Sequence, residues 1–196
     1  MFDAVVIGAS SGGMQALKTL LSALPASFLL PIVIVQHIHE HSDAYLAEYL
    51  SRAGALAVKD AEDKETPQPG MAYLAPAGYH LLIEPDGSFS LSMDEKVNYC
   101  RPSIDMLFES AADAFGDRLI GVVLTGANAD GAAGLKIIRQ RGGMAIVQNP
   151  KTAESPYMPQ AAMQCAQPDH VLDLEKIAPL LIKLNERISY GTGTAS

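Results

Sequence analysis

Short apolar runs alternate along the chain with segments of helical spacing. Residues 3–7 and 31–36 are two such runs, rich in Val and Ile, and each precedes a segment in which apolar residues recur every three or four positions. Strands that are apolar at nearly every position are buried on both faces, which is typical of parallel sheets covered by helices. The alternation predicts a doubly wound α/β fold with a mostly parallel sheet and helices on both faces.

The middle of the chain departs from this pattern. Between residues 55 and 91 the apolar runs are shorter, and the last of them carries Pro85-Asp-Gly at its centre, a sequence typical of a hairpin turn. We expect this portion to be inserted or antiparallel, with an added hairpin over residues 81–91.

Strand and helix alternate again in the second half. We expect helices over residues 103–115 and 175–188, a buried strand over 119–124 and a short helix after Pro159. The pattern predicts a single domain over residues 1–188. The remaining residues, 189–196, are rich in Gly and Thr and are expected to form a flexible tail.

Composition excludes several classes of protein. The chain has 196 residues, 48% of them hydrophobic, and a net charge of −8 with no basic cluster, which argues against nucleic acid and anionic membrane as partners. Its most apolar stretch, residues 20–35, is interrupted by prolines and too short to insert into a membrane. Only Cys100 and Cys165 are present, without the spacing of a disulfide framework or zinc site, and no secretory signal is visible. We therefore expect a cytoplasmic protein with reduced thiols.

Polar residues follow three of the expected strands. Ser10 follows the first strand, His37 the second, and Asp130 lies in the loop after Leu124. The carboxyl ends of parallel strands share one edge of a sheet, where ligands bind in open α/β folds. A serine hydroxyl needs a base to become a nucleophile, neutral imidazole suits that role, and a carboxylate fixes its tautomer. The sequence predicts a catalytic triad of Ser10, His37 and Asp130, with Ser10 on a turn like a nucleophile elbow.

Purely structural roles compete with this interpretation. Ser10 could be an ordinary turn residue and His37 a structural or surface histidine. Asp130, in Asn-Ala-Asp-Gly, is also a good helix cap.

Two other functions are compatible with parts of the pattern. The Gly-rich turn is similar to that of an NAD(P)-binding Rossmann-type oxidoreductase, but its spacing is Gly8-x3-Gly12-Gly13, and Gln36-His37 stands where an acidic ribose ligand is expected. The alternating histidines His37, His39 and His41 could instead belong to a metal hydrolase.

Taken together, the motifs resemble the catalytic domain of the CheB-type chemotaxis receptor methylesterases. The matching segments occur in family order at residues 7–13, 36–37, 73–76, 101–108, 124–134, 148–149 and 158–159, together with His80. The resemblance implies hydrolysis of glutamate γ-methyl esters on the cytoplasmic domain of methylated chemoreceptors, and deamidation of certain receptor glutamines. It implies Ser10 as nucleophile, His37 as base and Asp130 as the orienting carboxylate, with no metal or organic cofactor.

The chain departs from the family pattern near the expected site. Ser11 replaces the usual Thr, Ile38-His39 replaces a Met-Pro pair, and the loop before Asp130 reads Ala127-Asn128-Ala129. We expect the Ser11 and Ala127 N–H groups to bind the oxyanion, and Arg101 and Met158 to contact substrate at the rim. A receiver domain usually precedes this domain, whereas here the first strand starts at Asp3, so we expect control by a separate regulatory protein.

Overall fold

A computed structural model of the protein describes residues 2–37 and 45–189, and it contains a seven-stranded sheet in which every neighbouring pair is parallel. The strand order is β3-β4-β2-β1-β7-β8-β9. These strands are β1 (Ala4–Ala9), β2 (Ile32–Gln36), β3 (Ala57–Asp60), β4 (Met71–Leu74), β7 (Leu119–Val123), β8 (Met144–Gln148) and β9 (His170–Leu172).

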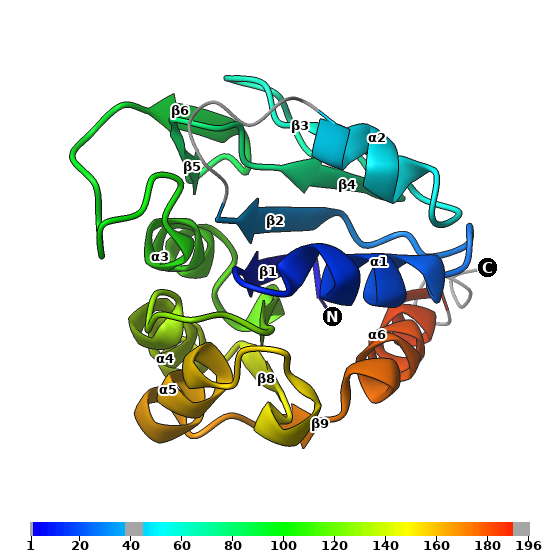
Figure 1. Ribbon diagram of the computed structural model, residues 1–196. Coiled ribbons are helices and arrows are strands. Elements are labelled where there is room, and N and C mark those ends of the chain that lie inside the picture. The colour runs from blue at the N-terminus through cyan, green and yellow to red at the C-terminus, as the bar shows by residue number, and fades with distance from the viewer. Residues whose placement is uncertain (1, 38–44, 190–196) are drawn as a thin grey trace.

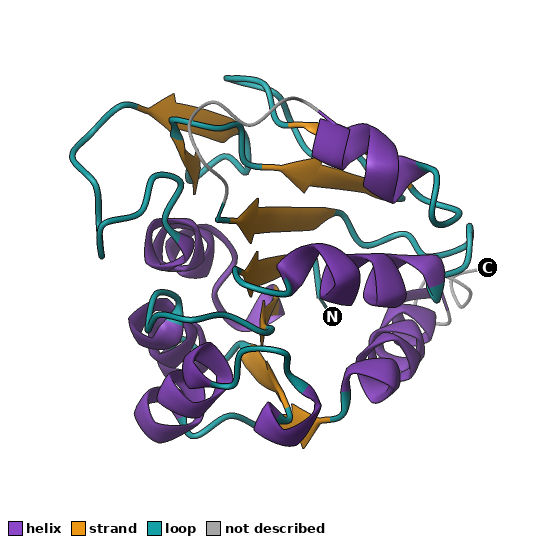
Figure 2. Ribbon diagram, viewed as in Figure 1, coloured by secondary structure: helices purple, strands orange, loops and turns teal. Residues whose placement is uncertain are grey.

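Helices cover both faces of this sheet (Figures 1 and 2). One face packs against α1 (Gly13–Ser22), α2 (Tyr45–Ser51) and α6 (Leu174–Ser189), and the other against α3 (Ile104–Phe115), α4 (Ala132–Gln140) and α5 (Tyr157–Ala166). Successive side chains of β1 enter the two cores alternately, Val5 and Ile7 on the α1 side and Ala4 and Val6 on the α3 side. The doubly wound fold expected from the apolar strands is confirmed. Short 3-10 helices, η1 (Gly116–Arg118) and η2 (Pro150–Thr152), complete the elements.

The middle of the chain divides between two sheets. β5 (His80–Ile83) and β6 (Phe89–Ser92) form the expected antiparallel hairpin, which is attached to α3 by a hydrogen bond from the Ile83 N–H to Ser110 Oγ at 3.1 Å. The prediction that the whole middle portion is inserted or antiparallel is wrong for β3 and β4, because β3 pairs in parallel with β4 and β4 pairs in parallel with β2. Both have only four residues, and edge strand β3 is partly exposed, so their burial pattern was weak in the sequence.

The structure also corrects one helix boundary. The prediction that a helix begins after Pro159 is wrong, because α5 begins at Tyr157. A proline is tolerated in the first turn of a helix, where its missing N–H would have no intrahelical partner. The expected tail lies, apart from Ser189, outside the described residues. No helix in the described ranges is long and apolar enough to cross a bilayer.

The order in which strands are added to the sheet reverses at β1. Strands β2, β4 and β3 lie on one side of β1, and β7, β8 and β9 lie on the other. The carboxyl ends of β2, β1 and β7 are therefore adjacent, as the sequence predicted. In open α/β sheets, such a reversal of strand order opens a crevice at the carboxyl ends of the strands, where ligands bind.

Candidate active site

Ser10 lies in the tight turn between β1 and α1. Its N–H donates to the Thr125 carbonyl at 3.0 Å, and its own carbonyl accepts from the Gly13 N–H at 2.7 Å. Gly12 has a φ of +77°, a left-handed conformation that favours glycine, and a side chain at Gly13 would overlap Gln36. The small residues therefore allow α1 to start directly beside Ser10.

His37 leaves the neighbouring strand at the same level. Ala9 and Gln36 are the last register pair between β1 and β2, and the His37 N–H donates to the Ala9 carbonyl at 3.0 Å. Ser10 and His37 are each the next residue after that pair. The parallel register thus brings their backbones together from positions 27 residues apart in the sequence.

Asp130 is fully buried and lies 2.8 Å, from Oδ2 to Nε2, from the His37 ring. Its carboxylate also accepts from the Ile104 N–H at 2.6 Å, the Ser103 hydroxyl at 2.9 Å, Asn98 Nδ2 at 3.1 Å and the Asp105 N–H at 3.2 Å. Burial opposes the charged form, but the hydrogen bonds from His37, Ile104 and Asn98 outweigh it and lower the pKa of Asp130. The carboxylate is therefore charged and immobile beside the imidazole.

Asp130 also caps a helix, though not the one that follows it. The two N–H groups it accepts belong to the first turn of α3, whereas the N-cap position of α4 is Gly131. The positive end of the α3 dipole adds to the stabilisation of the carboxylate. The cap interpretation and the site interpretation of Asp130 are thus compatible.

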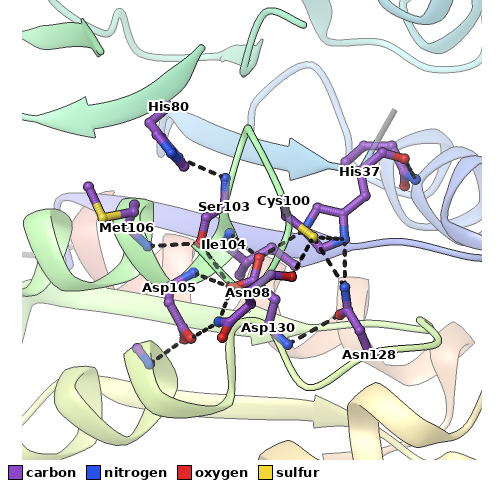
Figure 3. A network of polar contacts seen from close by, with 12 residues as sticks. His37, His80, Asn98, Cys100, Ser103, Ile104, Asp105, Met106, Asn128 and Asp130 are labelled. Carbon is purple, nitrogen blue, oxygen red and sulfur yellow. Dashed lines mark hydrogen bonds and ion pairs between the residues drawn. The ribbon is translucent and has the colours of Figure 1, made fainter. Parts of the chain in front are cut away.

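The second nitrogen of His37 does not contact Ser10. Among the described residues the Ser10 hydroxyl has no hydrogen-bond partner, so the expected Ser10 to His37 bond is not formed. His37 Nδ1 instead lies 3.7 Å from Cys100 Sγ and 3.4 Å from Asn128 Nδ2 (Figure 3). Catalytic hydrogen bonds are often long without substrate, and here Ser10 would have to replace Cys100 or Asn128 at this nitrogen.

The surroundings of His37 favour its protonated form. Burial acts against the charge, since the side chain is only 12% exposed, but the hydrogen bond to Asp130 and the contact with Cys100 together raise the pKa of His37 to about 9. In this arrangement the resting imidazole holds a proton at neutral pH.

Several residues of this network were not identified from the sequence. Cys100, Asn98 and Asn128 surround His37 and Asp130, and they come from loops without periodicity (Figure 3). Ser103, at the start of the helix expected over residues 103–115, accepts from the Met106 N–H as its cap, and its hydroxyl also donates to Asp130. Buried His80, which is one of the matching motif residues, accepts from the Ser103 N–H at 3.2 Å.

The two expected oxyanion donors, Ser11 and Ala127, lie on loops that are linked by hydrogen bonds. The Thr125 hydroxyl donates to the Ser11 carbonyl at 2.8 Å and accepts from the Ser155 N–H at 2.8 Å. Ser11 and Ala127 are both exposed, and neither N–H donates to another described residue. Both groups therefore remain available to a ligand.

Met158 differs from its expected placement at the rim, whereas Arg101 is half-buried and next to Cys100. Met158 is fully buried, and its N–H donates to the Gly126 carbonyl at 2.9 Å, so it supports the loop that carries Ala127. Arg101 Nη1 donates to the carbonyls of Met93 and Asp94 at 2.9 and 3.1 Å, which holds the loop leading to Cys100. Both residues support neighbouring loops in this structure.

The comparisons with known proteins agree on one family. Residues 5–181 match the family model described as CheB methylesterase. A protein of Leptospira interrogans is 52% identical over 185 residues, covering 94% of this chain and 96% of that protein. The protein-glutamate methylesterase/protein-glutamine glutaminase of Maricaulis maris is 37% identical over 184 residues, covering 92% of this chain and 46% of that protein. The crystal structure of the Thermotoga maritima CheB methylesterase catalytic domain is 35% identical with a TM-score of 0.90, covering 94% of this chain and 99% of that one.

The fold and the family match define a carboxylic ester hydrolase on a doubly wound sheet, with its polar groups at the switch point. The chain belongs to the CheB methylesterase family. The comparisons give no support to the Rossmann oxidoreductase or to the metal hydrolase. His39 and His41, on which the latter depended, lie outside the described residues.

Proposed function

We propose that the domain formed by residues 1–188 hydrolyses glutamate γ-methyl esters on the cytoplasmic domain of methylated chemoreceptors and deamidates receptor glutamines. The observation that carries the proposal is the 2.8 Å contact between His37 and buried Asp130, at the strand end next to Ser10. A charged carboxylate on one imidazole nitrogen leaves the other to exchange protons with a serine and a leaving group. The relatives' names supply the substrate class.

The reaction follows from these positions. With His37 neutral, Nδ1 accepts the Ser10 proton as Oγ attacks the ester carbonyl, and Asp130 stabilises the imidazolium that forms. The N–H groups of Ser11 and Ala127 bind the oxyanion, each contributing roughly a hundredfold or more in rate. His37 then protonates the departing methoxide or, in deamidation, the amide nitrogen, which leaves as ammonia. Water attacks the acyl-enzyme by the reverse steps.

Entry into this cycle requires a local rearrangement. Cys100 and Asn128 contact the nitrogen that Ser10 must reach, so one of these side chains has to withdraw when substrate binds. The Cys100 side chain lies on the loop held by Arg101, at the surface end of the network. We place the enzyme in the cytoplasm, with a separate regulatory protein as its partner.

Methanol release from a methylated receptor fragment tests the proposal. The intact chain should release methanol, and Ser10→Ala should lower kcat by several orders of magnitude, with about 10⁶ as an upper guide from other serine hydrolases. Ser10 is a turn residue at the surface of the site, so the variant should fold normally. Undiminished release by Ser10→Ala would contradict the serine mechanism, and NAD(P) binding or strict dependence on added metal would favour the rejected alternatives.

A further inference from the structure

Cys100 forms a cluster with His37 that the hydrolytic reaction does not use. Its Sγ lies 3.7 Å from His37 Nδ1, and donor atoms of His37, Cys100 and Asp130 all lie within 4.8 Å of one another. Thiolate and imidazole are the ligands that zinc prefers in proteins.

We propose that His37 and Cys100 form an inhibitory zinc site, in which the ion occupies the imidazole nitrogen needed for catalysis. The inhibition, but not the binding, rests on the proposed function. An ion on Nδ1 removes the lone pair that would accept the Ser10 proton, so hydrolysis stops while the metal is bound. The ion is an inhibitor here and takes no part in the reaction.

The spacing of the two donor atoms fits one zinc ion. With bonds of about 2.0–2.1 Å to nitrogen and about 2.3 Å to sulfur, tetrahedral coordination places the two ligand atoms about 3.6 Å apart. The observed separation of 3.7 Å therefore needs almost no movement of either side chain. The thiol and the protonated His37 imidazole each lose one proton to solvent when the metal binds.

Asp130 completes the arrangement from the far side of the ring. A metal-bound histidine usually donates its other N–H to a carboxylate, which fixes the ring and makes it a stronger ligand. His37 Nε2 lies 2.8 Å from Asp130 Oδ2 and so meets this requirement. Asp130 itself is fully buried and already accepts from several donors, so we assign it the orienting role and not that of a direct ligand.

Asn128 is the group that zinc must displace. Its Nδ2 lies 3.3 Å from Cys100 Sγ and 3.4 Å from His37 Nδ1, which is close to the place of the ion. The Asn128 side chain is partly exposed and can turn outward. Water would fill the remaining coordination positions, so binding should be weaker than at a structural site with four protein ligands.

Cobalt(II) titration tests the binding without relying on enzymatic activity. Chelator-treated protein should develop a near-ultraviolet thiolate-to-cobalt charge-transfer band that zinc chloride then abolishes. Cys100→Ser should lose this band, whereas Cys165→Ser should keep it, because Cys165 is exposed and makes no hydrogen bond to His37 within residues 2–37 and 45–189. Absence of the band in the wild type, or its loss only in Cys165→Ser, would overturn the site.

Two further measurements keep the outcomes distinct. Zinc chloride should inhibit methanol release by the wild type, and chelator should restore it. Cys100→Ser should need at least about tenfold more zinc for the same inhibition. Removing an outer hydrogen-bond partner already lowers metal affinity by that factor, and removing a direct ligand lowers it at least as much. A cobalt band in a protein without esterase activity would support the metal site and contradict the proposed function. An active enzyme without the band would support the proposed function and contradict the metal site.

If Cys100→Ser fails to fold, X-ray absorption of the zinc-loaded wild type tests the site. One sulfur and one imidazole ligand are expected, and a coordination shell of oxygens alone would overturn the site.

Discussion

His37 is held between a buried carboxylate and a thiol, and this environment determines when it can act as a base. Asp130 Oδ2 contacts one ring nitrogen at 2.8 Å, and Cys100 Sγ lies 3.7 Å from the other. Ser10, His37 and Asp130 could be identified from the sequence because each follows a strand whose apolar run is easily recognised. Cys100 could not, since no regular spacing in residues 93–102 shows which side chain of that loop turns toward the imidazole.

The raised pKa of His37 predicts an alkaline activity profile. Only the neutral imidazole can accept the Ser10 proton, and although burial acts in the opposite direction, Asp130 and Cys100 raise the pKa of His37 from 6.5 to about 9. The value of kcat/KM should therefore rise about tenfold per pH unit below about pH 9 and level off above it. Cys100→Ser should move the rising limb to lower pH, with Cys165→Ser as the control. A profile that is already flat between pH 7 and 9 would contradict this account.

At the scale of secondary structure, the turn between β1 and α1 positions Ser10, the proposed nucleophile. Gly12 adopts a φ of +77°, and a Cβ there would lie 2.7 Å from Glu154 Cβ. The strand, the turn and the helix were all recognisable in the sequence from the apolar run, the glycines and the leucine spacing. The parallel pairing of β3 and β4 was not, because pairing direction depends on distant partners and four-residue strands carry little pattern of their own.

Two glycine variants separate the role of this turn from backbone strain. Gly78 has a φ of +80°, and no atom lies within 4 Å of the position that an added methyl group would take, so it matches Gly12 in conformation but has open space around it. Gly12→Ala and Gly78→Ala should each lose about 1–2 kcal/mol of unfolding free energy from the left-handed conformation. Only Gly12→Ala should also lower kcat, by up to about a hundredfold, since it displaces Ser10 and Ser11. Urea unfolding and methyl ester hydrolysis measure the two effects, and equal kcat values in both variants would contradict the positional role.

At the scale of the whole molecule, the reversal of strand order at β1 assembles the site from both halves of the chain. Ser10 and His37 come from the first half, while Asp130 follows β7 and is fixed by the first turn of α3. Asp105 extends this connection, because its carboxylate accepts from the Gly134 N–H of α4 at 2.7 Å and from Asn98 at 3.0 Å. The site network is therefore continuous with the packing of α3 against α4.

Asp105 should make global stability depend on pH. Burial, followed by the charges of Asp130 and Glu109, raises the pKa of Asp105 to about 6 despite the Gly134 hydrogen bond. A carboxyl group whose pKa is raised by folding contributes its full stabilisation at pH values below its pKa in the unfolded chain, 3.8. This contribution is lost as the pH rises through about 6, the pKa in the folded protein. Relative to Asp105→Asn, the free energy of unfolding of the wild type should fall by at most about 3 kcal/mol between pH 4 and pH 7.

Urea unfolding of both proteins across that pH range provides the measurement. Asp117→Asn, at an exposed position, removes the same formal charge and serves as the control. If the difference in unfolding free energy between the wild type and Asp105→Asn does not change with pH, then Asp105 is ionised without cost in the folded protein and this account of it is wrong.

The identity of the nucleophile can be tested most directly by covalent labelling. A fluorophosphonate reacts with an activated serine hydroxyl at an esterase site and leaves a stable adduct that peptide mass spectrometry can locate. We expect one adduct per chain, on Ser10, formed faster as pH rises toward 9 because His37 must be neutral, and absent from Ser10→Ala and strongly reduced in His37→Ala. Labelling on Cys100 or Ser11 instead of Ser10, or no labelling of a protein that releases methanol, would contradict the assignment of Ser10 as the nucleophile of this hydrolase.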